Sequence, residues 1–184
     1  MPKFTITRFI KAVYWNHRLN QKFKNKNYNL QDLEYYIYLN ALKSYDNYHN
    51  VFNDDVDAEI YSHSVYLVFH YSLLVSPITN HTKTKVSRDL YSFHEHKIKK
   101  CLRKYFNIAS EDIDNMFFDY LSQYSIASSV DDLINVSSKF FQTYVQNAPS
   151  SSILFPFMAH DITSKLSFIL DIYDYIVPHY KLKK

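Results

Sequence analysis

The sequence of 184 residues contains no glycine. Glycine adopts left-handed backbone angles without steric cost, so it builds tight hairpins, phosphate-binding loops and nucleotide-binding turns. Its absence excludes Walker-type and Rossmann-type nucleotide sites at the level of the sequence. A helical bundle is compatible with this composition, because serine, asparagine and aspartate can cap its helices.

Cysteine is almost absent as well, since Cys101 is the only one. An internal disulfide is therefore impossible, and a cysteine-based zinc site is excluded. Cys101 stands at helical spacing beside Ile98 and Leu102, so we expect its thiol to be buried as a small hydrophobic group.

Long hydrophobic runs are also missing. The longest, VYLVFHYSLLV at residues 65–75, is too short to span a bilayer and contains His70. The N-terminal stretch MPKFTITRFIKAVYW is basic but lacks the apolar segment and cleavage site of a secretory signal. The sequence therefore predicts a cytoplasmic protein with no membrane segment.

Hydrophobic residues are nevertheless plentiful, at 47% of the chain, and aromatic residues make up 18%. They recur every three or four positions, which indicates amphipathic helices. FTITRFI and SVYLVFHY could alternate as strands, but no hairpin dipeptide follows either, so both are expected to be helical. We predict an all-α fold, a single compact bundle of about six helices over residues 1–184, with a basic segment at 1–29. The expected helices cover residues 30–50, 53–76 (at the centre, ended by Pro77), 90–105, 110–124, 129–144 and 166–177 (ended by Pro178).

Charge is arranged in blocks along the chain. Residues 1–29 and 76–107 are strongly basic, residues 30–75 and 108–180 are strongly acidic, and the tail KLKK is basic again. Such blocks can hold neighbouring helices together by charge pairing. Alternatively, the two basic blocks share one face and attract a phosphate backbone. In that case four aromatic residues that interleave with the first block can stack on bases; they are Tyr14, Trp15, Phe23 and Tyr28.

The nine histidines form no recognisable metal motif. His63 and His70 are two helical turns apart, about 10 Å along the axis, which is too far to share one ion. His94 and His96 flank Glu95, and neighbours two apart on a helix point in different directions. The sequence therefore predicts no metal site and no cofactor.

One segment, SRDLYSFHEHKIKKCL at residues 87–102, carries a chemical hint. Metal-free RNA cleavage needs a cation at the scissile phosphate and an imidazole that transfers a proton near neutral pH. An arginine, a polar residue and a histidine a few positions later on a helix form the motif of HEPN domains. RDLYSFH resembles that motif, and LYSFHEHKIK is similar to segments of the AbiV group of phage-resistance HEPN proteins.

The resemblance implies a dimeric, metal-independent endoribonuclease of a phage-defence or toxin type. In it, Arg88 holds the phosphate, His94 acts in proton transfer and Asp89 orients one of them. RNA affinity then comes from a basic cluster through counterion release; its members are Lys83, Lys85, Lys97, Lys99, Lys100, Arg103 and Lys104. Six residues of ideal helix place Arg88 and His94 about 120° apart, and a half-buried structural role for His94 remains open.

Two other functions fit the same sequence. The first is a non-enzymatic interaction protein of a phage or mobile element, such as an anti-defence inhibitor that imitates DNA phosphates. Its contact residues would lie in the acidic block and would be Asp112, Asp119, Asp131 and Asp132. The second is a nucleic-acid-binding helical module that uses the basic segment 1–29. The expected partner is thus RNA or another protein.

Overall fold

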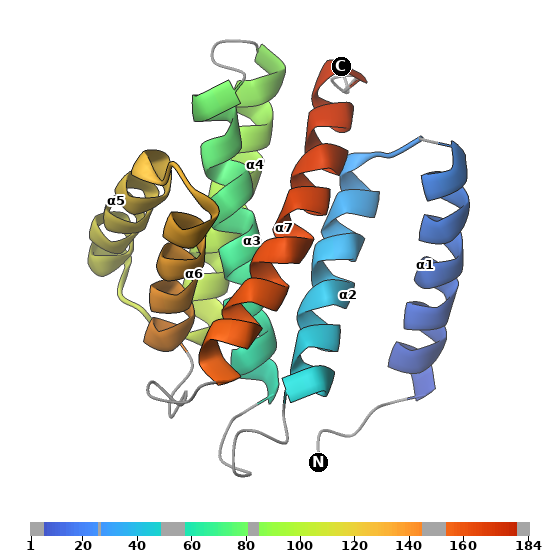
Figure 1. The fold of residues 1–184 in the computed structure, drawn as a ribbon, viewed down its shortest axis with the longest axis horizontal. Coiled ribbons are helices and arrows are strands. Elements are labelled where there is room, and N and C mark those ends of the chain that lie inside the picture. The colour runs from blue at the N-terminus through green and yellow to red at the C-terminus, as the bar shows by residue number, and fades with distance from the viewer. Residues whose placement is uncertain (1–5, 26, 49–57, 81–84, 145–153, 180–184) are drawn as a thin grey trace.

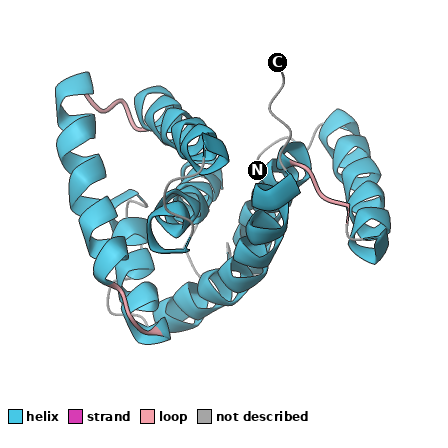
Figure 2. Ribbon diagram, turned by 90° about the horizontal axis from the view of Figure 1, so that it is seen from above, coloured by secondary structure: helices cyan, strands magenta, loops and turns pink. Residues whose placement is uncertain are grey.

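The computed structural model describes residues 6–25, 27–48, 58–80, 85–144 and 154–179. These residues form seven helices and no strand, so the all-α prediction is confirmed (Figure 1; Figure 2). The helices, in chain order, are α1 (Ile6–Asn25), α2 (Leu30–Tyr48), α3 (Ala58–Asn80), α4 (Lys85–Tyr105), α5 (Ser110–Ile126), α6 (Val130–Tyr144) and α7 (Leu154–His179).

The central position of α3 is confirmed. It packs against α2, α4, α5, α6 and α7, and α7 lies between it and α2 in the view of Figure 1. Its residues are buried on all sides from Leu67 to Val75. A helix that is apolar all round is stable only inside a protein, which explains why the longest hydrophobic run of the sequence became the middle of the bundle.

Several helix ends differ from the prediction. The helix α3 continues to Asn80, past Pro77, and α7 continues to His179, past Pro178, because a proline so near the end of a helix interrupts only its last turn. The helix α4 begins at Lys85, before its predicted start at residue 90. The helix α7 begins at Leu154, well before the predicted start, with Pro156 in its first turn. A proline there costs little, since the first backbone N–H groups of a helix have no partner within it. The predicted start of the second helix, at residue 53, lies outside the described residues.

Asparagine, serine and aspartate perform the tasks that glycine often performs. Asn107, after α4, has a φ of 50°, the left-handed conformation that asparagine tolerates better than most residues. Ser129 and Asp132 cap α6 reciprocally, since each backbone N–H donates to the other's side chain. The helix α5 has no such cap, because Ser110 lies within its first turn and the capping residue Ala109 makes no side-chain bond.

The helix α1 packs at the edge of the bundle against α2. Arg18 and Lys22 of α1 form ion pairs with Asp32, whose side chain is fully buried. Asp32 also belongs to a reciprocal cap with Asn29 at the start of α2. The buried hydrophobic cluster itself comes from α2 to α7, so a charged contact attaches α1 to a core formed by the other helices.

Candidate functional site

The helix α4 carries the residues singled out in the sequence, and its two faces differ sharply. Leu90, His94, Ile98 and Cys101 form a buried stripe at the three- and four-residue spacing of one helix face. The opposite side is exposed and basic. The expected burial of Cys101 is confirmed, and burial raises the pKa of its thiol to about 12.

The structure does not bring Arg88 and His94 together at one surface. Arg88 is exposed and Asp89 is half-buried, whereas the exposed fraction of His94 is 0%. The reason is the helical spacing, which turns the two side chains about 120° apart and places His94 on the apolar stripe. Within this single chain, the imidazole of His94 has no surface at which to meet a phosphate. Ribonuclease activity remains a prediction that only an assay tests.

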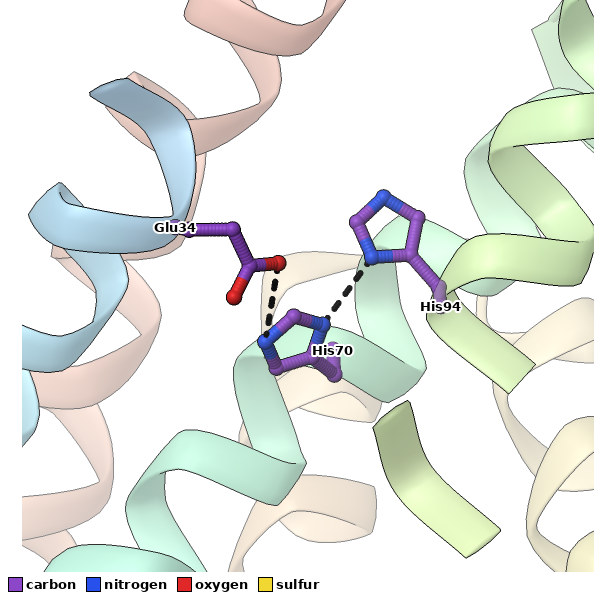
Figure 3. A group of neighbouring side chains, drawn as sticks. All are labelled: Glu34, His70 and His94. Atoms are coloured by element: carbon purple, nitrogen blue, oxygen red, sulfur yellow. Dashed lines mark hydrogen bonds and ion pairs between the residues drawn. The ribbon is translucent and has the colours of Figure 1, made fainter. Parts of the chain in front are cut away.

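Inside the bundle, His94 lies close to His70 and Glu34, two residues that its position in the sequence does not associate with it. Figure 3 shows Glu34 of α2, His70 of α3 and His94 of α4 converging; we call them the Glu34–His70–His94 cluster. The Nδ1 atoms of the two histidines are hydrogen-bonded at 2.9 Å. His70 Nε2 lies 3.6 Å from Glu34 Oε1. One ligand-type atom from each residue lies within 4.8 Å of the other two.

Burial keeps both imidazoles of the cluster neutral. It lowers the pKa of His70 to about 3, with a smaller contribution from the positive charge of Lys97. It also lowers the pKa of His94 well below its usual value, and His70 adds to the effect. A buried imidazolium would lose its hydration without gaining an equivalent partner, so the uncharged form is favoured.

Glu34 connects the cluster to the surface, since its side chain is 15% exposed. Its Oε2 accepts a hydrogen bond of 2.8 Å from the hydroxyl of Tyr66, and the Lys97 ammonium lies 3.7 Å from the same oxygen. Lys97, expected to bind RNA, also lies over the ring of Phe93. These contacts occupy Oε2 and leave Oε1 directed toward His70.

Three atoms of the cluster are buried without a hydrogen-bond partner among the described residues. They are Glu34 Oε1, His70 Nε2 and His94 Nε2. The 3.6 Å between the first two is too long for a hydrogen bond, and a neutral His70 forms no ion pair with Glu34. Buried polar atoms are normally satisfied in folded proteins, so three orphans in one cluster require an explanation.

The exposed side of α4 forms a second candidate site, which we call the α4 groove. It is a hollow of about 630 Å³, and its lining residues are Ser92, Glu95, His96, Lys99, Lys100, Arg103 and Lys104. The structure thus places four of the seven predicted RNA-binding residues around one hollow. Lys83 lies outside the described residues, and so does the side chain of Lys85.

The cations of the α4 groove differ in how they are held. Lys99 forms ion pairs with Glu95 at 3.1 Å and with Asp114 of α5 at 2.8 Å, and these contacts raise its pKa. Lys104 donates to the hydroxyl of Tyr105. Lys100 and Arg103 are exposed and make no ion pair within the described part of the chain. Their charges are free to meet an external anion.

The four aspartates considered for phosphate mimicry do not share one structural role. Asp112, Asp119 and Asp131 are exposed, and Asp119 accepts a hydrogen bond from Gln123. Asp132 accepts bonds from Ser128 and Ser129 at the start of α6, and these bonds lower the pKa of its carboxyl. A local structural role therefore accounts for Asp132.

Comparisons with known protein families, with curated proteins and with solved structures find no significant match to this chain. The resemblance to HEPN domains thus stays a prediction. No described helix is long and apolar enough to cross a membrane.

Sequence reasoning missed the Glu34–His70–His94 cluster because its members come from three helices and lie 36 and 24 positions apart. A signal was present: His70 interrupts the most apolar run, and His94 falls on the apolar stripe of α4. Two histidines predicted to be buried need polar partners, and each could have been identified as the partner of the other. Nothing in the sequence singled out Glu34, which follows the buried Leu33.

Proposed function

We propose that the protein binds RNA, and that the α4 groove is the surface that receives it. The observation that carries this proposal is the gathering of Lys99, Lys100, Arg103 and Lys104 around one hollow, with Lys100 and Arg103 free of ion pairs within the described residues. A lysine or arginine that neutralises a phosphate releases condensed counterions, which is the main driving force for binding a nucleic-acid backbone.

The groove also contains groups that distinguish a nucleic acid from a simple anion. His96 is exposed beside the cations, and its ring offers a donor or acceptor and a flat surface for a base. The four cations form two pairs on successive turns of α4, Lys99 with Lys100 and Arg103 with Lys104, which suits a backbone that carries repeated charges.

The test is the salt dependence of binding to a labelled single-stranded RNA, measured by fluorescence anisotropy. Four phosphate contacts predict that log K falls with log[salt] with a slope of about −3. The double variant Lys100→Ala/Arg103→Ala should bind about tenfold more weakly or worse at low salt, with a slope shallower by about 1.5. The matched control Lys43→Ala/Lys139→Ala removes the same charge from exposed positions on α2 and α6 and should bind normally.

Equal weakening by both double variants would show that overall charge, and not the α4 groove, attracts the RNA. Absence of salt-dependent binding by the native protein would reject the proposal altogether. A tight complex with a protein and none with RNA would favour the alternative, an interaction protein of a phage or mobile element.

A narrower proposal is that bound RNA is cleaved without a metal by a homodimer that uses Arg88, Asp89 and His94. Support for it comes from the segment RDLYSFH and from the position of Arg88 on the helix that carries the basic groove. Incubation of RNA in EDTA tests it, with light scattering as the measure of dimer formation. Cleavage that is lost in both Arg88→Ala and His94→Ala, while both variants stay folded, would support it. Intact RNA in the native sample would reject it.

A further inference from the structure

We propose that the Glu34–His70–His94 cluster is a binding site for a divalent transition-metal ion of the Zn²⁺ class. The site is separate from the α4 groove and does not depend on RNA binding. The three side chains come from α2, α3 and α4 and point toward one another (Figure 3). The sequence predicts no metal site because spacing within each helix provides none, whereas the three-dimensional fold brings the ligands together.

The chemistry of the ligands defines the class of ion. Two imidazole nitrogens and one carboxylate oxygen suit Zn²⁺ and its neighbours Co²⁺ and Fe²⁺, whereas Mg²⁺ and Ca²⁺ prefer oxygen alone. Both imidazoles are uncharged, which is the form that binds a metal. Three protein ligands leave one position of a tetrahedral ion open for water.

The distances require only a small adjustment. Ligand atoms of a tetrahedral site with bonds of 2.0–2.1 Å lie about 3.4 Å apart. The separations of 2.9 Å between the histidines and 3.6 Å between His70 and Glu34 lie close to that value. The two distances involve different nitrogens of His70, and only one of these nitrogens can bind the ion. When one ligand atom is taken from each residue, the atoms lie up to 4.8 Å apart, so the longest of these distances must shorten by about 1.4 Å. We expect rotation of an imidazole ring to provide this movement, with the hydrogen bond between the histidines replaced by two metal bonds.

The orphan atoms are the second observation that points to a ligand. Glu34 Oε1, His70 Nε2 and His94 Nε2 are buried without a hydrogen-bond partner among the described residues. An ion at the centre of the cluster coordinates Glu34 Oε1 and at least one of these nitrogens, and so satisfies at least two of the three orphan atoms. The exposed edge of Glu34 provides the way in, because His70 and His94 are fully buried.

The surroundings hold the ligands in place. The hydroxyl of Tyr66 binds Glu34 Oε2, and the Tyr66 ring lies 4.3 Å from that of His70. The rings of Phe93 and Tyr173 flank His94 at 5.4 Å and 5.7 Å. Partners of this kind orient metal ligands and exclude bulk water. Lys97 opposes the ion with its positive charge, because its ammonium lies 3.7 Å from Glu34 Oε2.

The experiment uses the full chain, stripped with EDTA and dialysed, and then titrated with Zn²⁺ in competition with a chromophoric chelator. One Zn²⁺ per chain is expected, together with a rise in the unfolding midpoint. Co²⁺ should produce the visible absorption of a tetrahedral nitrogen- and oxygen-ligated ion. Removal of one ligand by His94→Gln or Glu34→Gln should weaken binding at least about 100-fold, since even outer contacts are worth 10–100-fold.

Two controls make the result decisive. His63→Gln on α3 and His160→Gln on α7 remove histidines outside the cluster and should bind Zn²⁺ normally. Lys97→Met removes the opposing charge and should tighten binding, by about tenfold, which tests the site even if the ligand variants do not fold. Binding of less than one ion per chain overturns the proposal. It is also overturned if the folded ligand variants bind like the native protein, or if Lys97→Met leaves the affinity unchanged.

Discussion

The two buried imidazoles predict that the metal-free protein loses stability as the pH falls below about 6.5. In the unfolded chain His70 and His94 titrate near that value, whereas in the folded chain burial lowers both pKa values, that of His70 to about 3. The unfolded state therefore binds more protons between these limits, and the free energy of unfolding decreases as the pH falls. The facing groups are Glu34, Lys97, Tyr66 and Tyr173, none of which is expected to reverse this direction.

The magnitude follows from the proton count. Each histidine lowers the free energy of unfolding by about 1 kcal/mol at pH 5.5 and by about 2 kcal/mol at pH 5, relative to its value at neutral pH. Together they remove about 4 kcal/mol at pH 5, a large part of the 5–15 kcal/mol that stabilises an ordinary domain. Most carboxyl groups titrate below this window, at about 4, and contribute little to the change.

Urea unfolding at several pH values between 7.5 and 5, with EDTA throughout, measures the effect. The double variant His70→Gln/His94→Gln should show a much flatter dependence, whatever its stability at neutral pH. The control His160→Gln replaces an exposed histidine of α7 and should keep the native dependence. A native protein whose free energy of unfolding is constant across this range would refute the reasoning.

Two further predictions concern the core. Phe140 is fully buried, with its ring 4.7 Å from Tyr71 and 4.6 Å from Tyr120. Phe140→Ala should therefore lower the free energy of unfolding by about 3–5 kcal/mol, and a change below about 1 kcal/mol in denaturant unfolding would contradict this packing. Cys101 is 5% exposed, and burial raises its pKa to about 12. Its thiol should resist alkylation at pH 8 until urea unfolds the chain, so rapid labelling of the folded protein would contradict its burial.

Much of the fold was predictable because amphipathic periodicity is a local property. The starts of α2 and α5 and the end of α6 coincide with the predicted ones. The ends near prolines were less predictable, since the effect of Pro77 and Pro156 depends on their position within a helix that the sequence does not define in advance. The basic face of α4 was also predictable, because exposure of charged residues follows from the same periodicity.

The interior polar contacts were not predictable in this way. The stripe that includes Leu90, His94 and Ile98 correctly indicated a buried side of α4, but which residues face His94 depends on how α2 and α3 pack against it. Packing between helices distant in sequence is not encoded in spacing along one helix. The Glu34–His70–His94 cluster therefore emerged only with the three-dimensional arrangement.

The ion pairs of Asp32 have a consequence for the basic N-terminal segment. Arg18 and Lys22 neutralise a carboxylate that has no access to water, so part of the segment's positive charge is an internal counterion and is not offered to a partner. Replacement of both cations by Arg18→Met/Lys22→Met would spare the hydrophobic cluster yet leave Asp32 as a buried anion without a charged partner, at a cost of about 3–5 kcal/mol. A chain with these two substitutions should thus need an uncharged residue at position 32 to regain its stability.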